Sequence, residues 1–133
     1  ENIGRMSTYV ASSLITLERF TEALVYLNRG IETIVEFGTG IADELHCIGV
    51  YGNYLKSIEA YEMATSYYSL VFHHDLYPKE SKEGIAKDLA ECDANLDKET
   101  YQSAIERGKL LDVHDTIQDV LQQIENQIEF HYL

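Results

Sequence analysis

The chain has 133 residues, of which 23 are acidic and 10 are basic, so its formal net charge is −13 at pH 7. This length fits a single domain, and such a charge repels phosphate backbones and anionic lipid headgroups while it favours basic partners. Only two cysteines occur, Cys47 and Cys92, and no apolar run approaches the roughly 20 residues that cross a bilayer. We therefore expect a cytoplasmic protein that binds neither nucleic acid nor membranes.

Apolar residues recur at spacings of three and four along most of the chain, which a single proline, Pro78, interrupts. Such spacings predict helices. Two helices form a first hairpin over about residues 2–37, and two more form a second hairpin over about residues 41–76. Weaker patterns over about residues 79–133 predict capping helices or a third repeat. We therefore expect one all-α domain over residues 1–133, with about seven helices.

The two hairpins carry one pattern of large and small residues, repeated at an offset of 41 positions. Six positions match between them: Val10, Ala11, Leu14, Ala23, Leu27 and Gly30 correspond to Tyr51, Gly52, Leu55, Ala64, Tyr68 and Val71. Small residues let two helices approach closely, and large residues fill the gap to the next hairpin. We therefore predict that Ala23 and Ala64 occupy equivalent close contacts in two copies of one packing unit.

The second-helix stretches Ala23–Gly30 and Ala64–Val71 resemble the A-x-x-x-F-x-x-A pattern of the tetratricopeptide repeat. This resemblance covers about residues 5–78 and implies antiparallel hairpins stacked as a short right-handed superhelix. The offset of 41 positions exceeds the family's usual length of about 34 residues, and no tryptophan begins either hairpin. Longer helices, or a longer link at Phe37–Asp43, would absorb the additional residues.

In the tetratricopeptide family, the first helix of each hairpin lines a concave face that binds peptides. The resemblance therefore implies a groove lined by Arg5, Thr8, Ser12, Ile15 and Thr16 in the first hairpin and by His46, Gly49, Asn53, Lys56 and Ser57 in the second. Basic residues and asparagine can orient a peptide's C-terminal carboxylate, which singles out Arg5, Asn53 and Lys56. The alternative, that each is an ordinary solvated residue, stays open. The expected function is to bind a peptide or protein surface.

The histidines and carboxylates form no recognisable metal or catalytic motif. Asp43 and His46 stand three residues apart on a predicted helix, but adjacent His73 and His74 point about 100° apart and cannot easily reach one ion. No nucleophile motif or phosphate-binding loop is present, so we expect neither catalysis nor a cofactor. Six tyrosines crowd the second hairpin, and their helical spacing favours core packing over a ligand pocket: Tyr51, Tyr54, Tyr61, Tyr67, Tyr68 and Tyr77.

The last predicted helix carries a heptad-like seam, formed by Leu110, His114, Ile117, Leu121, Ile124 and Ile128. A seam of this length favours packing on its own domain, and a homodimer through the C-terminal helix is the alternative. An alternative function follows from the same helix, which could transmit a signal. In that case the chain is a regulatory, sensory or dimerisation segment of a larger bacterial signalling protein, such as a transcription regulator or a nucleotide cyclase.

Overall fold

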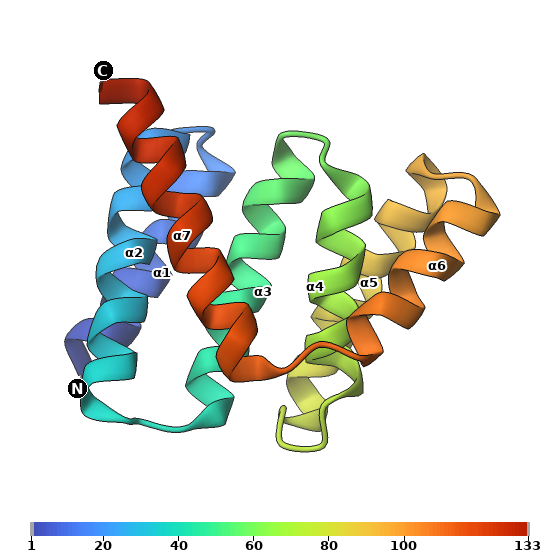
Figure 1. Ribbon diagram of the computed structural model, residues 1–133, viewed down its shortest axis with the longest axis horizontal. Coiled ribbons are helices and arrows are strands. Elements are labelled where there is room, and N and C mark those ends of the chain that lie inside the picture. The colour runs from blue at the N-terminus through green and yellow to red at the C-terminus, as the bar shows by residue number, and fades with distance from the viewer. Residues whose placement is uncertain (1, 133) are drawn as a thin grey trace.

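The computed structural model describes residues 2–132, with the side chains of residues 3–129. Residues 1 and 133 of the predicted domain lie outside the described residues. Seven helices and no strand form the described part of the chain (Figure 1), in this order: α1 (Asn2–Thr16), α2 (Phe20–Phe37), α3 (Ile41–Ser57), α4 (Tyr61–His73), α5 (Lys79–Asn95), α6 (Lys98–Lys109) and α7 (Val113–Tyr132).

The first four helices pair into two antiparallel hairpins that lie side by side. Helix α1 packs against α2, and α3 packs against α4 and against both helices of the first hairpin. Helices α5 and α6 both pack on α4 but make little contact with each other. The stack therefore runs from α1 and α2 at one end to α5 and α6 at the other (Figure 1). The predicted all-α stack of helical hairpins is confirmed.

The turns inside the first two hairpins have the same backbone geometry. Glu18 and Glu59 stand 41 positions apart, and both adopt the left-handed conformation, with φ of 59° and 63°. In each turn two successive N–H groups donate to carbonyls of the preceding helix over 2.8–3.0 Å: Glu18 to Ile15 and Arg19 to Leu14, then Glu59 to Lys56 and Ala60 to Leu55. Paired bonds of this kind close the C-terminal end of a helix. The two hairpins therefore repeat one turn at the offset found in the sequence.

Ala23 and Ala64 occupy the same place after these two turns. The N–H of each donates to the carbonyl of the fourth preceding residue at 3.0 Å, and the two side chains are 1 % and 0 % exposed. Four other matched pairs are buried in both hairpins: Ala11 with Gly52, Leu14 with Leu55, Leu27 with Tyr68, and Gly30 with Val71. The sixth pair differs, because Val10 is exposed whereas Tyr51 is buried.

Long helices, rather than a long link, account for the length of the repeat. Helix α2 has 18 residues and α3 has 17, and only Gly38, Thr39 and Gly40 separate them. Gly38 ends α2 in the left-handed conformation, with φ of 58°, which glycine adopts without a steric penalty. Of the two explanations for the additional residues, the structure therefore selects longer helices.

Helices α4 and α6 approach each other closely through small residues. The hydroxyls of Ser66 and Ser69 in α4 donate to the carbonyls of Ala104 and Ile105 in α6, at 3.0 and 2.8 Å. A Cβ atom at Gly108 would overlap the Ser66 carbonyl oxygen and would lie 2.6 Å from the Cβ of Ser69. Helix α6 contacts the rest of the domain mainly through α4. This close contact therefore holds α6 in place at the end of the stack.

The last helix, α7, returns along the chain and packs against α2 and α3. In Figure 1 it crosses in front of these two helices, far from α5. Its residues Ile117, Val120 and Ile124 are 0 % exposed, so the apolar seam of the C-terminal helix packs within its own domain. The first two residues of the predicted seam, Leu110 and His114, are exposed.

Four of the six tyrosines around the second hairpin lie in the core, whereas Tyr61 and Tyr77 are partly buried and line surface hollows. Tyr51, Tyr54, Tyr67 and Tyr68 are all buried, which agrees with core packing rather than with a ligand pocket. Three of their hydroxyl groups form hydrogen bonds with other side chains. The side chain of Gln123 in α7 accepts a bond from Tyr51 at 2.9 Å and donates one to Tyr67 at 2.8 Å, and Tyr68 donates to Asn53 at 2.6 Å.

Candidate functional site

The residues that the sequence assigns to a groove differ widely in exposure. Arg5, Thr16 and Ser57 are exposed, and Ser12, His46, Asn53 and Lys56 are partly buried. Thr8 is fully buried: its hydroxyl donates to the Arg5 carbonyl at 2.7 Å, and its methyl group faces Gly30 of α2. Ile15 and Gly49 are also buried. Thr8, Ile15 and Gly49 therefore offer no surface to a partner.

The two basic residues of the predicted groove pair with acidic residues of the neighbouring hairpin. Arg5 of α1 donates to both carboxylate oxygens of Asp43 in α3, each at 3.2 Å. Lys56 of α3 donates to Asp88 and Glu91 of α5, at 2.7 and 3.1 Å. Each pair joins the first helix of one hairpin to the first helix of the next, so these cations contribute to the stacking of the hairpins.

The ion pairs determine how these side chains ionise. Burial lowers the pKa of the Lys56 ammonium, but the hydrogen bonds and charges of Asp88 and Glu91 outweigh it and hold that pKa above its ordinary value. Burial raises the pKa of the Asp43 carboxyl, but the hydrogen bonds of Arg5 and Thr39 and the charges of Arg5 and His46 together outweigh it and lower this pKa overall. A carboxylate of a peptide would therefore compete with Asp88 and Glu91 for Lys56.

Arg5 and His46 meet at a hollow of about 230 Å³ between α1, α3 and the start of α5, where Tyr9, Asp43 and Tyr77 also line the wall. The rings of Tyr9 and His46 lie 5.6 Å apart, and Nε2 of His46 is buried without a hydrogen-bond partner. Burial lowers the pKa of His46. Asn53 and Lys56 lie outside this hollow, so the structure unites only part of the predicted set.

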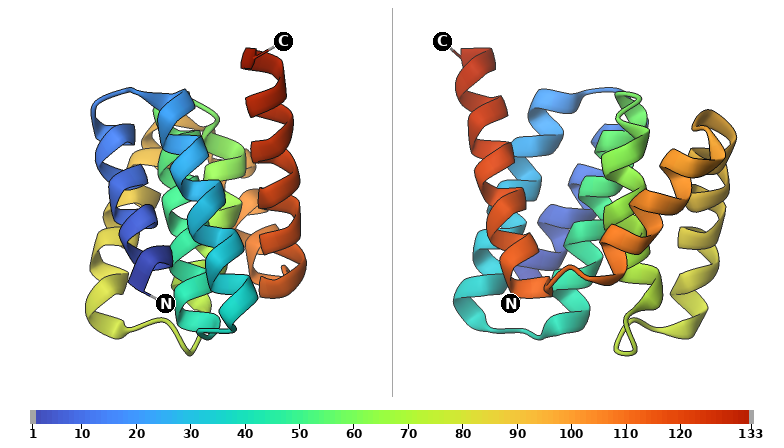
Figure 2. Two further views of the ribbon diagram at one scale, coloured as in Figure 1. Left: turned by 90° about the vertical axis from the view of Figure 1, so that its left-hand side faces the viewer. Right: turned by 45° about the vertical axis from the view of Figure 1, so that its right-hand side comes forward.

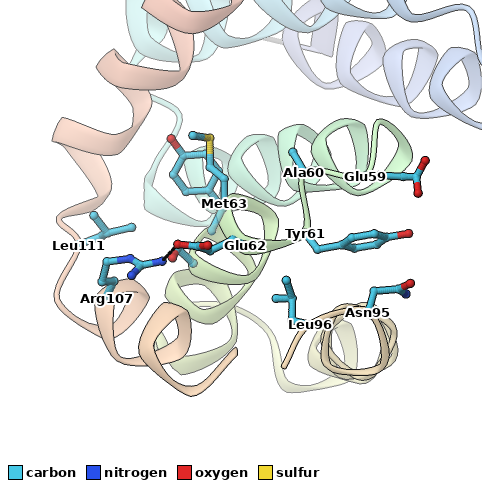
Figure 3. A pocket seen from close by; sticks show the side chains of 11 residues that line it. Glu59, Ala60, Tyr61, Glu62, Met63, Asn95, Leu96, Arg107 and Leu111 are labelled. Carbon is cyan, nitrogen blue, oxygen red and sulfur yellow. Dashed lines mark hydrogen bonds and ion pairs between the residues drawn. The ribbon is translucent and has the colours of Figure 1, made fainter. Parts of the chain in front are cut away.

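A larger hollow of about 760 Å³ lies between the start of α4, the end of α5 and the end of α6 (Figure 3). Its wall is mainly apolar and includes Tyr61, Met63 and Leu96. Arg107 donates to Glu62 at 2.8 Å at its edge, as Figure 3 shows. No residue of the predicted groove lines it. Sequence patterns do not reveal such a hollow, because its residues come from three separate helices.

Helix α1 exposes an apolar face at the end of the stack. We call it the α1 face, and its large side chains and their exposed fractions are Ile3 65 %, Met6 64 %, Tyr9 61 %, Val10 40 % and Leu17 65 %. In the left view of Figure 2, α1 and α2 form this end, and no other helix lies in front of them. The sequence predicts a helix with apolar spacing in this segment, but it does not show which of its apolar residues are uncovered.

The α1 face corresponds to a buried surface in the second hairpin. At the offset of 41 positions, Met6, Tyr9 and Val10 match Cys47, Val50 and Tyr51, which are 0, 3 and 2 % exposed. Helix α3 packs against the first hairpin, α4 and α7, and Tyr51 contacts Gln123 of α7 and Tyr67 of α4. The α1 face is therefore the exposed counterpart of a surface that other helices cover in the second hairpin.

Comparisons of the chain with protein-family models, curated protein sequences and solved structures find no significant match. Across the described part of the chain, no three His, Cys, Asp or Glu side chains come together as metal ligands. His73 donates through Nδ1 to the Ser69 carbonyl at 2.9 Å, and His74 accepts the Leu76 N–H at 3.1 Å. None of the helices described is both long enough and apolar enough to cross a membrane.

Proposed function

We propose that the chain is a non-enzymatic protein-binding module, built like a tetratricopeptide stack, that binds a partner protein along the first-helix side of its first hairpin. The observation that carries this proposal is the α1 face, where five large apolar side chains are 40–65 % exposed. Contiguous exposed apolar surface is uncommon on monomeric proteins and marks interaction sites. Family membership and the right-handed sense of the superhelix are part of the proposal.

Tyr9 connects this face to the hollow beside it. Its side chain belongs to the α1 face and also lines the hollow with Arg5 and His46. A partner seated on α1 therefore lies beside a hollow lined by a guanidinium and a phenol, which can bond to polar groups of a peptide. The formal charge of −13 favours a partner with basic groups around its apolar contacts.

Affinity capture with a single charged substitution on the α1 face tests this function. The immobilised chain is compared with its Met6→Glu variant, in which a carboxylate replaces a side chain that is 64 % exposed. We expect capture of partner proteins to fall at least about tenfold, because docking would bury an unpaired charge. Leu110→Glu is the matched control, since Leu110 is 87 % exposed and lies outside α1. Equal capture by Met6→Glu and the unaltered chain would disprove the proposal.

A further inference from the structure

We propose, on the basis of the function proposed above, that the partner covering the α1 face is a second copy of this chain, docked with α1 antiparallel to α1 of the other copy. The spacing of the face supports a helix as the occupant. Ile3, Met6, Val10, Ser13 and Leu17 follow one another at alternating spacings of three and four. Such a seam lies straight along one helix and packs against another helix.

The charge of α1 favours a second copy. Residues 2–17 contain no aspartate or glutamate, although the chain has 23 acidic residues. Two copies with a formal charge of −13 each repel one another through most of their surfaces. Contact through α1 brings no carboxylates of the two helices together, and Arg5 is the only charged residue among residues 2–17.

The outer surfaces of α5 and α6, at the opposite end of the stack, do not favour a head-to-tail arrangement. Neither α5 nor α6 exposes a large apolar side chain, and their outer surfaces carry residues such as Glu83, Lys87, Gln102 and Glu106. The α1 face therefore finds no apolar complement on the outer surfaces of α5 and α6 in a second copy. The same surface of that copy is its complement, and a contact between identical surfaces closes as a two-fold dimer.

The area of the α1 face is sufficient for a weak dimer. At roughly 150–200 Å² for a fully exposed large side chain, the five side chains present on the order of 500 Å² per copy. Two copies then bury on the order of 1,000 Å², which is at the lower limit for a specific interface. We therefore expect dissociation constants in the micromolar range, with Val10 near the two-fold axis because it stands midway between Ile3 and Leu17.

Sedimentation of the full chain across about 1 to 300 µM, the range in which an interface of this size dissociates, measures the dimer. We expect a concentration-dependent dimer whose dissociation constant rises at least about tenfold in Val10→Glu and stays unchanged in Leu110→Glu. A chain that is monomeric at every concentration would overturn the inference. A dimer that Val10→Glu leaves intact would overturn it too, because another surface would then hold the copies together.

A cysteine at the axis tests the antiparallel arrangement. In Val10→Cys the two thiols of a dimer lie close enough for copper-phenanthroline to oxidise them to a disulfide, with release of two protons and two electrons. Cys47 and Cys92 are buried and do not interfere. We expect rapid cross-linking in Val10→Cys and not in Glu83→Cys, which places the thiol on α5. Equal cross-linking of both variants would contradict the arrangement.

These measurements separate the two proposals. If the chain is monomeric but Met6→Glu abolishes capture of another protein, the second-copy inference fails and the protein-binding function stands. If the chain is monomeric and Met6→Glu captures the same proteins as the unaltered chain, both fail.

Discussion

The side-chain amide of Gln123 accepts a hydrogen bond of 2.9 Å from the hydroxyl of Tyr51, a residue 72 positions earlier in the chain. Its amide nitrogen also donates to the hydroxyl of Tyr67 at 2.8 Å. One glutamine of α7 thus satisfies buried phenols of α3 and α4. Burial raises the pKa of the Tyr51 phenol, so this phenol stays neutral and donates its proton throughout the physiological range.

Replacing Gln123 with leucine should destabilise the domain by about 1–3 kcal/mol, because two phenol groups in the core lose their partner. The free energy of unfolding in urea measures this loss. Gln122→Leu is the control, since Gln122 is exposed and bonds only to the side chain of Asn126 on its own helix. A shift of more than about 0.5 kcal/mol in the control would show that α7 tolerates no leucine in this region.

Two glycine-to-alanine substitutions should have opposite effects. Gly108→Ala places a methyl group against the backbone and side chains of α4, and overpacking of this kind destabilises by about 1–3 kcal/mol. Gly84→Ala meets no atom within 4 Å, so the higher helix propensity of alanine should stabilise by about 0.5–1 kcal/mol. Thermal unfolding of both variants compares the signs. A stabilising Gly108→Ala would mean that α6 moves freely relative to α4.

Glu18 and Glu59, which adopt the left-handed backbone conformation in the hairpin turns, are sites where a substitution should stabilise the domain. Glu18→Gly and Glu59→Gly should each stabilise the domain by up to about 1 kcal/mol, because glycine adopts positive φ without the penalty of a Cβ atom. Their effects should add, because each substitution changes the backbone preference of its own turn only. The control Glu83→Gly lies within α5 and should destabilise by about 1 kcal/mol. Chemical denaturation of the three variants provides the measurement.

His46 should make stability depend on pH. Burial lowers the pKa of its imidazole below the ordinary value of 6.5, and the charge of Asp43 offsets only part of this effect. Below that value the unfolded chain binds more protons than the folded one, so stability falls as the pH decreases through about 6.5. His46→Gln should lose less stability than the unaltered chain between about pH 7.5 and 5.5. Identical pH dependence in urea titrations would contradict this role.

The fold could be predicted from the sequence because each hairpin depends on local patterns. The spacing of apolar residues predicts the helices, and the glycines and the proline predict where they end. The offset of 41 positions is found again in the two turns at Glu18 and Glu59. The weak third repeat was harder to define. Ala104 and Gly108 stand near the positions where a third repeat would carry small residues, and both are buried. Their helix, however, packs on α4 instead of forming a close hairpin with α5.

The candidate site depends on contacts that no local pattern contains. The partners of Lys56 lie 32 and 35 residues away, so the sequence did not show that this cation is already paired. Thr8 occupies a plausible groove position, but the absence of a side chain at Gly30 lets α2 approach and cover it. Conversely, Met6 and Val10 are apolar residues of the kind that usually lies in a core. Only the arrangement of the hairpins shows that they are exposed.

The position of α7 also bears on the order in which the native contacts form. Its bonds to Tyr51 and Tyr67 span 72 and 56 residues, whereas the turn bonds of the hairpins close over a few residues. Long loops lose more entropy on closure and close later, so we expect α7 to dock after the hairpins have paired. During that interval the apolar residues of α7 are still in water, and a newly made chain is then most prone to aggregate.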